Sequence, residues 1–517
     1  MSEKLKKGIL AGGLISTGGL FLAKLIGLAY TIPFSYILGS EAYMGMYGGA
    51  YRIYSYILQV FTAGMPFAIT TIIARYATKG EWQTVLRVKS LSNRIMLICG
   101  FVGMLALWAL SPVLAPAMTT TENIPVMLYV LFILGFALLV IPLVSSYRGY
   151  LDGVKDLKTY SASQVYEQII RVGFLLGASF LITSVLHKQS VWALYASVWS
   201  TSIAGIATLF YLRKKTRNIQ SPVKSLENPP ATKDLIKELL LLSLPYFLNA
   251  VLGYADDLIS STIIPVGLKD AGNYNSHEIE TIVSAFNYAG TKLIAIPLIL
   301  APGFTASMIP HLTEDLTKGD YKTLRESMCN VISIVIVIAL PVCAFIFYYA
   351  NPIYDLLFYT KDLELCTSVT RYLVVEGFCS TLSLILTGIM MACNQKRKVI
   401  GVSLFSVILK VCFTYLAVSH FGYKGAVGLS VLGFIFVLSY CFITLKRVYD
   451  VDLLKIFGVF ISAIILTMIS LYLSHLVPMT PDSKITLLVY LTITGIIFVG
   501  VYGLFALMMQ KISRKDA

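Results

Sequence analysis

The feature that most constrains the fold is a succession of long segments that carry no charge. A helix needs about 20 apolar residues to cross a bilayer, and the uncharged runs that reach this length are 53–74, 95–121, 123–147, 189–212, 327–354, 425–445, 456–481 and 485–510. Charged residues make up 13% of the 517 positions, against about a quarter in soluble domains. The sequence therefore predicts an all-α integral membrane protein.

Further apolar runs reach the same length if one charged residue is tolerated, which raises the expected number of transmembrane helices to about 14. The predicted spans are 8–38, 46–74, 95–114, 126–147, 160–186, 190–212, 239–266, 280–310, 328–350, 370–393, 398–419, 425–445, 455–476 and 485–510. The N-terminal segment continues into the first span and has no small-residue cleavage site, so we expect a retained helix and not a signal peptide.

The basic residues predict the orientation. With the N-terminus inside, 30 of the 41 lysines and arginines fall on the inner side, 6 in outer loops and 5 within spans. This bias is typical of cytoplasmic loops, so we expect both termini in the cytoplasm of a bacterial cell. The net charge of +14 is then explained by topology and anionic lipids, and no nucleic-acid partner is expected.

One segment reappears further along the chain. Residues 78–84 read TKGEWQT and residues 317–323 read TKGDYKT, an offset of 239. Other pairs coincide at the same offset: Gly64 with Gly303, Gly149 with Gly388, and Arg171 with Lys410. A constant register over this length indicates an internal duplication.

The duplication predicts two pseudo-symmetric lobes of six helices each. We expect an N-lobe at 1–212, a cytoplasmic linker at 213–238, a C-lobe at 239–451, and two further helices within 452–517. Both copies begin on the inner side, so the repeat is parallel. Transporters built in this way place the substrate path between the repeats and alternate its access by rocking.

Nine charged residues fall inside predicted spans, where each costs at least a few kcal/mol and usually faces a cavity or a partner; they are Lys24, Arg52, Glu167, Arg171, Asp256, Asp257, Lys292, Glu376 and Lys410. Arg52 corresponds by the repeat to position 291, next to Lys292, although Arg52 is also near enough to the outer end of its span to reach headgroups. Cations at matching places in two lobes suit a diphosphate.

The other buried charges leave alternatives open. Glu167 precedes Arg171 by four residues, a spacing that predicts an ion pair on one helix face. We expect this pair to be structural, whereas Lys410 has no such acid. The carboxylates of Asp256, Asp257 and Glu376 either carry a coupling proton or bind Na⁺, or they balance nearby basic residues.

Glycine and proline gather where helices are expected to bend. The candidate hinges are Gly64 and Pro66 in the second predicted span, and Pro302 and Gly303 in the eighth. Such breaks are tolerated in membranes where protein or water satisfies the backbone. Close helix packing through small residues explains paired glycines equally well.

Resemblance to a known family is carried by residues 38–41, 50–55, 62–66, 287–293 and 301–307. These segments resemble the polysaccharide-exporter branch of the multidrug/oligosaccharidyl-lipid/polysaccharide (MOP) superfamily, and within it the MurJ and SpoVB/YtgP group of lipid II flippases. The resemblance implies a V-shaped pair of lobes that flips an undecaprenyl-diphosphate-linked precursor, lipid II foremost, from the inner to the outer leaflet for peptidoglycan synthesis.

The resemblance also implies roles for particular residues. Cations on the first, second and eighth helices line the family's central cavity, which places Lys24 and Lys292 beside Arg52 as diphosphate-binding residues. The Arg-Asp pair that often follows the first-helix glycine is absent, since residues 28–31 read LAYT. The last two helices would form a groove for the lipid tail.

We expect no cofactor, no metal other than a possible, unassigned Na⁺, and transport driven by membrane potential or an ion gradient. The expected partners are the lipid-linked oligosaccharide, membrane lipids and the cell-wall synthesis machinery, with the protein itself a monomer. The alternatives are an exporter of another lipid-linked polysaccharide unit and a cation-coupled multidrug exporter of the MATE type. A membrane glycosyltransferase is disfavoured because the chain has no Walker A, HExxH or nucleophile-elbow motif, so we expect no enzymatic activity.

Overall fold

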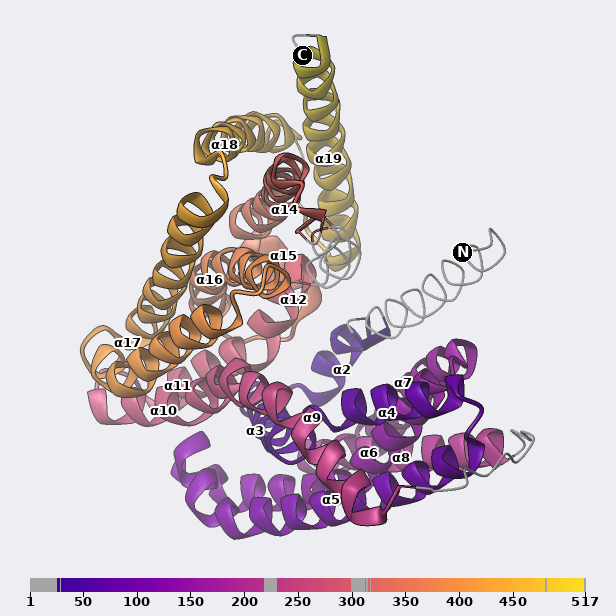
Figure 1. The fold of residues 1–517 in the computed structure, drawn as a ribbon. Helices are drawn as coiled ribbons and strands as arrows, with labels where there is room; N and C mark the ends of the chain where they lie inside the picture. The colour runs from indigo at the N-terminus through magenta and orange to yellow at the C-terminus, as the bar shows by residue number, and fades with distance from the viewer. Residues whose placement is uncertain are drawn as a thin grey trace. The chain divides into compact units, whose positions relative to one another are not determined.

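The computed structural model describes residues 26–27, 29–217, 230–298, 312, 315–316, 318–478 and 481–515. This part of the chain is almost entirely helical and contains no strand, so the predicted all-α membrane fold is confirmed. The chain divides into two compact units, Met1–Val266 and Gly267–Ala517, whose helices are labelled in Figure 1.

The first unit consists of α2 (Thr31–Leu38), α3 (Glu41–Thr62), α4 (Met65–Thr78), α5 (Trp82–Met118), the 3₁₀ turn η1 (Thr121–Asn123), α6 (Ile124–Gly153), α7 (Leu157–Phe180), the π-helix η2 (Leu181–Val185), α8 (Ser190–Arg217), α9 (Thr232–Gly253) and most of α10 (Ala255–Ala271). The second unit consists of the end of α10, α11 (Ser276–Ser284), the π-helix η3 (Ala285–Gly290), α12 (Thr291–Leu298), α14 (Tyr321–Tyr348), α15 (Ala350–Leu357), α16 (Leu363–Ala392), α17 (Lys396–Tyr449), α18 (Leu453–His475) and α19 (Lys484–Lys515).

Eleven helices in the described ranges are long and apolar enough to cross a membrane. One of them, α17, has 54 residues, which at 1.5 Å per residue amounts to about 80 Å, more than two bilayer cores. Its backbone is non-helical at Gly422, where φ is 60°. This break separates the predicted spans 398–419 and 425–445, whereas the total of fourteen spans stays a prediction.

The core of the first unit lies among α4, α5, α6, α8 and α9, and Figure 1 shows α5, α6 and α8 running side by side. Glycines on α6 allow α4 to approach closely: the Thr70 hydroxyl donates to the Gly149 carbonyl at 3.1 Å. A Cβ on Gly153 would lie 2.7 Å from a methyl carbon of Ile73. Small residues therefore bring these two helices together.

The predicted boundaries differ from the observed helices at several places, among them the expected linker. α8 continues to Arg217 and α9 begins at Thr232, so both helices extend into the expected linker 213–238. The α9 residues Leu235 and Leu239 are buried in the core of the first unit. The division into two six-helix lobes stays a prediction.

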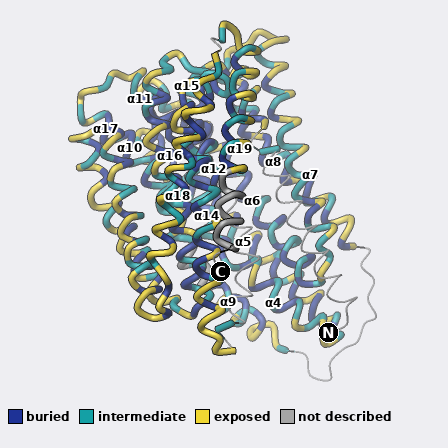
Figure 2. Tube along the Cα trace, turned by 90° about the horizontal axis from the view of Figure 1, so that it is seen from above, coloured by how far each residue is buried: buried dark blue, intermediate teal, exposed yellow. Residues whose placement is uncertain are grey.

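The core of the second unit is formed by α14, α16, α17 and α18, and Figure 2 draws the buried residues of the chain in dark blue. The hydroxyl of Ser474 on α18 lies 2.9 Å from that of Tyr349. The hydroxyl of Tyr502 on α19 donates to the Val337 carbonyl at 2.8 Å. These bonds tie α18 and α19 to α14 and to the residue that follows it.

The 239-residue offset reappears in the backbone of both units. Gly80 and Gly319 both adopt positive φ, 77° and 71°, and the residues after them begin α5 and α14. Lys155 and Asn394, at the same offset, have φ of 63° and 60°. Positive φ is uncommon outside glycine, so its recurrence at matched non-glycine positions supports the duplication independently of the sequence match.

The candidate hinge in the second predicted span coincides with the break between α3 and α4. Gly64 has φ 78° in the left-handed region, and Pro66 lies in the first turn of α4, where a missing N–H costs little. Pro302 and Gly303 lie outside the described residues. Movement at either place stays a prediction.

Candidate functional site

Arg52 lies on α3 in the first unit, and its side chain is 18% exposed. Its Nε lies 3.6 Å from Oδ1 of Asp257, in the first turn of α10, which is 28% exposed. Asp256, beside it, is also half-buried. The structure thus pairs Arg52, a predicted diphosphate-binding cation, with the predicted carboxylate Asp257. This geometry fits the charge-balance alternative. A coupling role for Asp256 or Asp257 stays a prediction.

Lys292 belongs to the second unit, where it is the second residue of α12 and half-buried. Lys24, the third predicted cation, lies outside the described residues. Directly before α12 the chain forms the π-helix Ala285–Gly290, all of whose residues are buried. π-helical turns occur frequently at functional sites, and the hydrophobic pattern of the sequence gave no sign of this one.

The π-helix and the turn before it carry buried polar atoms. Oδ1 of Asn287 and Oγ of Ser284 are inaccessible to solvent and have no hydrogen-bond partner among the described residues. The hydroxyl of Thr291, at the start of α12, donates to the Phe286 carbonyl at 2.8 Å. Unsatisfied buried acceptors are costly, so this segment adds polar groups beside Lys292 that sequence reasoning missed.

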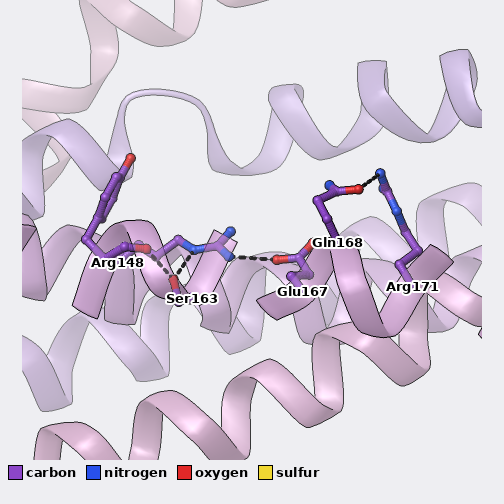
Figure 3. Close-up of polar contacts among 6 residues, drawn as sticks. Arg148, Ser163, Glu167, Gln168 and Arg171 are labelled. Carbon is purple, nitrogen blue, oxygen red and sulfur yellow. Dashed lines mark hydrogen bonds and ion pairs between the residues drawn. The ribbon is translucent and has the colours of Figure 1, made fainter. Parts of the chain in front are cut away.

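The predicted ion pair between Glu167 and Arg171 is wrong. The Glu167 carboxylate instead accepts from Nη2 of Arg148 at 2.8 Å, and Nε of Arg148 donates to Ser163 at 3.0 Å (Figure 3). Arg171 donates to Oε1 of Gln168 at 2.6 Å. The physical reason is tertiary: α6 brings Arg148 alongside α7, and a bond from a second helix replaces the local i,i+4 contact.

Arg148 is therefore a buried charge that the sequence analysis missed. It follows the predicted span 126–147 directly and was counted with the inner basic residues. In the structure α6 continues to Gly153, and the Arg148 side chain is only 17% exposed. The available signal was the presence of two arginines for one glutamate, Glu167, near the same predicted membrane depth.

The two remaining buried charges lie in the second unit. Lys410 of α17 is 5% exposed, and its Nζ lies 4.5 Å from the centre of the Phe434 ring, a cation–π contact. Gly433 allows a close approach of Ser406, since a Cβ there would lie 2.8 Å from Ser406 Oγ. Glu376 lies on α16 and is half-buried.

The described residues contain no cluster of three or more histidine, cysteine, aspartate or glutamate side chains that could hold a metal ion. In the described residues of each unit, arginine or lysine side chains occur instead with hydroxyls, amides and single carboxylates. Such groups bind anions through charge-assisted hydrogen bonds.

Comparison with known proteins identifies a family. Residues 9–315, more than half of the chain, match the family described as polysaccharide biosynthesis protein, and residues 281–416 match the MatE family. The chain is 26% identical to the lipid II flippase MurJ of Bacillus subtilis (strain 168) over 461 residues, 86% of this chain and 83% of that protein.

Solved structures share the fold. A structure of the lipid II flippase MurJ in an inward closed conformation superimposes with a TM-score of 0.66 at 14% identity and covers 96% of this chain and 99% of that one. An inward-facing multidrug resistance MATE transporter of the MOP superfamily gives 0.64 at 15% identity, covering 83% and 96%. At these identities the likeness shows the fold alone.

Proposed function

We propose that this chain, which belongs to the polysaccharide biosynthesis protein family, flips a lipid-linked cell-wall precursor. It is a multi-pass membrane transporter of the MOP superfamily. The substrate we infer is an undecaprenyl-diphosphate-linked unit, lipid II foremost. The observation that carries the proposal is the relation to MurJ of Bacillus subtilis over most of both chains. Half-buried basic side chains in each unit support it.

The proposed mechanism assigns the diphosphate to Lys24, Arg52 and Lys292. Two phosphates carry at least two negative charges, and arginine and lysine offer charge-assisted donors to their oxygens. The half-buried state of Arg52 and Lys292 leaves both side chains partly dehydrated, which strengthens their attraction for an anion. Alternating access between the leaflets follows the rocking of transporters built from parallel repeats.

Several further features complete the proposal. The protein lies in a bacterial cytoplasmic membrane with both termini inside, works without a cofactor or enzymatic step, and is driven by membrane potential or an ion gradient. It acts as a monomer beside the cell-wall synthesis machinery. The lipid tail follows α18 and α19, whose outward residues include Leu454, 84% exposed, and Ile485, 76% exposed.

The test is transport by purified protein in vesicles, with the diphosphate headgroup of lipid II read out by its accessibility in the outer leaflet. Arg52→Ala and Lys292→Ala should each abolish transport while membrane insertion is unchanged. Lys484→Ala is the matched control, since Lys484 is 52% exposed and pairs with Asp355 at one end of α19. Full transport by Arg52→Ala or by Lys292→Ala would refute the diphosphate-binding role of the residue replaced.

A second candidate is multidrug export, which the match of residues 281–416 to the MatE family favours. Overexpression should then confer drug resistance, and depletion should leave lipid-linked precursors in the outer leaflet at normal levels. Accumulation of such a precursor on the cytoplasmic leaflet after depletion would instead support the flippase.

A further inference from the structure

The guanidinium of Arg171 lies within the first unit without a carboxylate partner. Its Nη2 donates to Gln168 at 2.6 Å, while its Nε is inaccessible to solvent and has no hydrogen-bond partner in the described part of the chain. Glu167 is the described acid that interacts with Arg171 through space, and its carboxylate is bound to Arg148. Figure 3 shows Arg148 and Arg171 on either side of the α7 residues Ser163, Glu167 and Gln168.

The residues around Arg171 are hydroxyl-bearing. Tyr30, Tyr47 and Tyr51 interact with it electrostatically. The hydroxyls of Tyr30 and Tyr47 lie 3.2 Å apart, and that of Tyr51 lies 2.5 Å from Oγ1 of Thr201 on α8. Three chain segments, namely the residue before α2, α3 and α8, therefore contribute hydroxyls that interact with Arg171 or bond to a tyrosine that does.

The charges of this cluster do not balance. The three tyrosines and Gln168 are neutral, Glu167 offsets Arg148, and the positive charge of Arg171 remains. Residues 1–25, which precede Tyr30, contain a single acid, Glu3, and four lysines, Lys4, Lys6, Lys7 and Lys24. A guanidinium cannot lose its proton in a protein, and a buried charge without compensation costs several kcal/mol.

We propose that the cluster formed by Arg171, Gln168, Tyr30, Tyr47 and Tyr51 is a binding site for a small monovalent anion. Arg171 supplies the charge and the Nε donor, and the Tyr51 hydroxyl supplies a further donor, as anion sites built from oriented donors do. One uncompensated positive charge calls for one negative charge.

The packing favours a small ligand over a phosphate ester. Tyr47 and Tyr51 have ring centres 4.5 Å apart, and Phe34 packs 5.1 Å from Tyr47, so bulky groups are excluded between these rings. A diphosphate carries at least twice the charge that Arg171 offers. The proposed ligand is therefore a different class of anion from the diphosphate assigned to Arg52.

The experiment uses the purified full-length protein in lipid nanodiscs at constant ionic strength, with gluconate replaced stepwise by chloride or bromide. The thermal unfolding midpoint should rise with either halide, because an anion that binds the folded state stabilises it. Arg171→Gln should remove this dependence. Arg75→Gln is the matched control, since Arg75 is 45% exposed and pairs with Glu238, and its halide dependence should match that of the wild type.

A milder variant keeps the proposal testable if Arg171→Gln does not fold. Tyr51→Phe deletes one hydroxyl and should raise the halide Kd about tenfold, the effect of losing one hydrogen bond to a charged group. Unchanged halide dependence in Arg171→Gln, or an unchanged Kd in Tyr51→Phe, would overturn the proposal. Tighter binding of inorganic pyrophosphate than of chloride, lost in Arg171→Gln, would also overturn it, since the site would then be a diphosphate site.

Discussion

The pair formed by Arg148 and Glu167 gives a quantitative prediction about the stability of the first unit. The two charges are 2.8 Å apart and 17% and 12% exposed. At an effective dielectric of about 20 their attraction is about 6 kcal/mol, much of which offsets the cost of dehydrating both groups. Removing one partner of such a pair typically costs about 3–5 kcal/mol, because the other charge stays buried.

The two single variants should differ in cost. After Arg148→Gln, the Glu167 carboxylate can turn to Arg171, four residues further along the same helix, and recover part of the lost attraction. After Glu167→Gln, two arginines remain in the array and no acid balances either. We therefore expect Glu167→Gln to destabilise the protein by about 3–5 kcal/mol and Arg148→Gln by about 1–3 kcal/mol.

Denaturant titration of the purified protein in bilayer discs, followed by tryptophan fluorescence, measures both values, and the double variant completes a cycle that isolates the coupling. Glu238→Gln serves as the control, because its pair with Arg75 is 29% and 45% exposed and such pairs contribute less than about 1 kcal/mol. A larger loss for Arg148→Gln than for Glu167→Gln would show that Arg171 is no alternative partner.

Four further variants test the backbone, helix packing and one helix cap. Gly64→Ala should cost about 1–2 kcal/mol, because φ of 78° is left-handed, and unfolding midpoints would show it. Gly100→Ala should destabilise strongly, since a Cβ would collide with a backbone carbonyl of α6, whereas Gly173→Ala on α7 meets nothing within 4 Å and should be neutral or stabilising; equal midpoints for the two would contradict this. Hydrogen bonds from the Thr323 hydroxyl and backbone lower the pKa of Asp320, so its capping contribution should be present above the ordinary carboxyl range and be lost as pH falls through the lowered value. Midpoint-versus-pH curves of Asp320→Ala should lack this acid-side loss.

The fold was predictable to the extent that it depends on hydrophobicity and repetition. Uncharged runs of bilayer length identify membrane helices because lipid excludes charged groups and unpaired backbone. The offset of 239 predicted a duplication, and the positive φ shared by Gly80 and Gly319 agrees with it. Boundaries were less predictable, since the packing of α9 residue Leu235 into the first unit depends on tertiary contacts.

The candidate site was predictable in residue type and not in pairing. Burial of charge in an apolar span identified Arg52 and Glu167 from the sequence alone. The partner of each lies on another helix, Asp257 for the first and Arg148 for the second, and no local spacing specifies such a contact. The π-helix before Lys292 was also missed, because a one-residue change in helical repeat does not alter the apolar pattern.

The ion pair of Arg52 with Asp257 bears on how a transporter of this kind could release its substrate. A bare arginine in a membrane cavity would be costly in the empty protein, and Asp257 compensates it at 3.6 Å, a looser contact than the 2.8 Å pair on α7. Under the proposed function, a diphosphate that reaches Arg52 exchanges one anion for another, so the free energy of binding is the difference between two attractions. That difference is smaller than the full attraction of an uncompensated arginine, and a smaller difference favours release in the opposite leaflet. Under the proposed function, the loose internal counter-ion at Arg52 would suit substrate exchange, whereas the tight one at Arg148 stabilises the contact between α6 and α7.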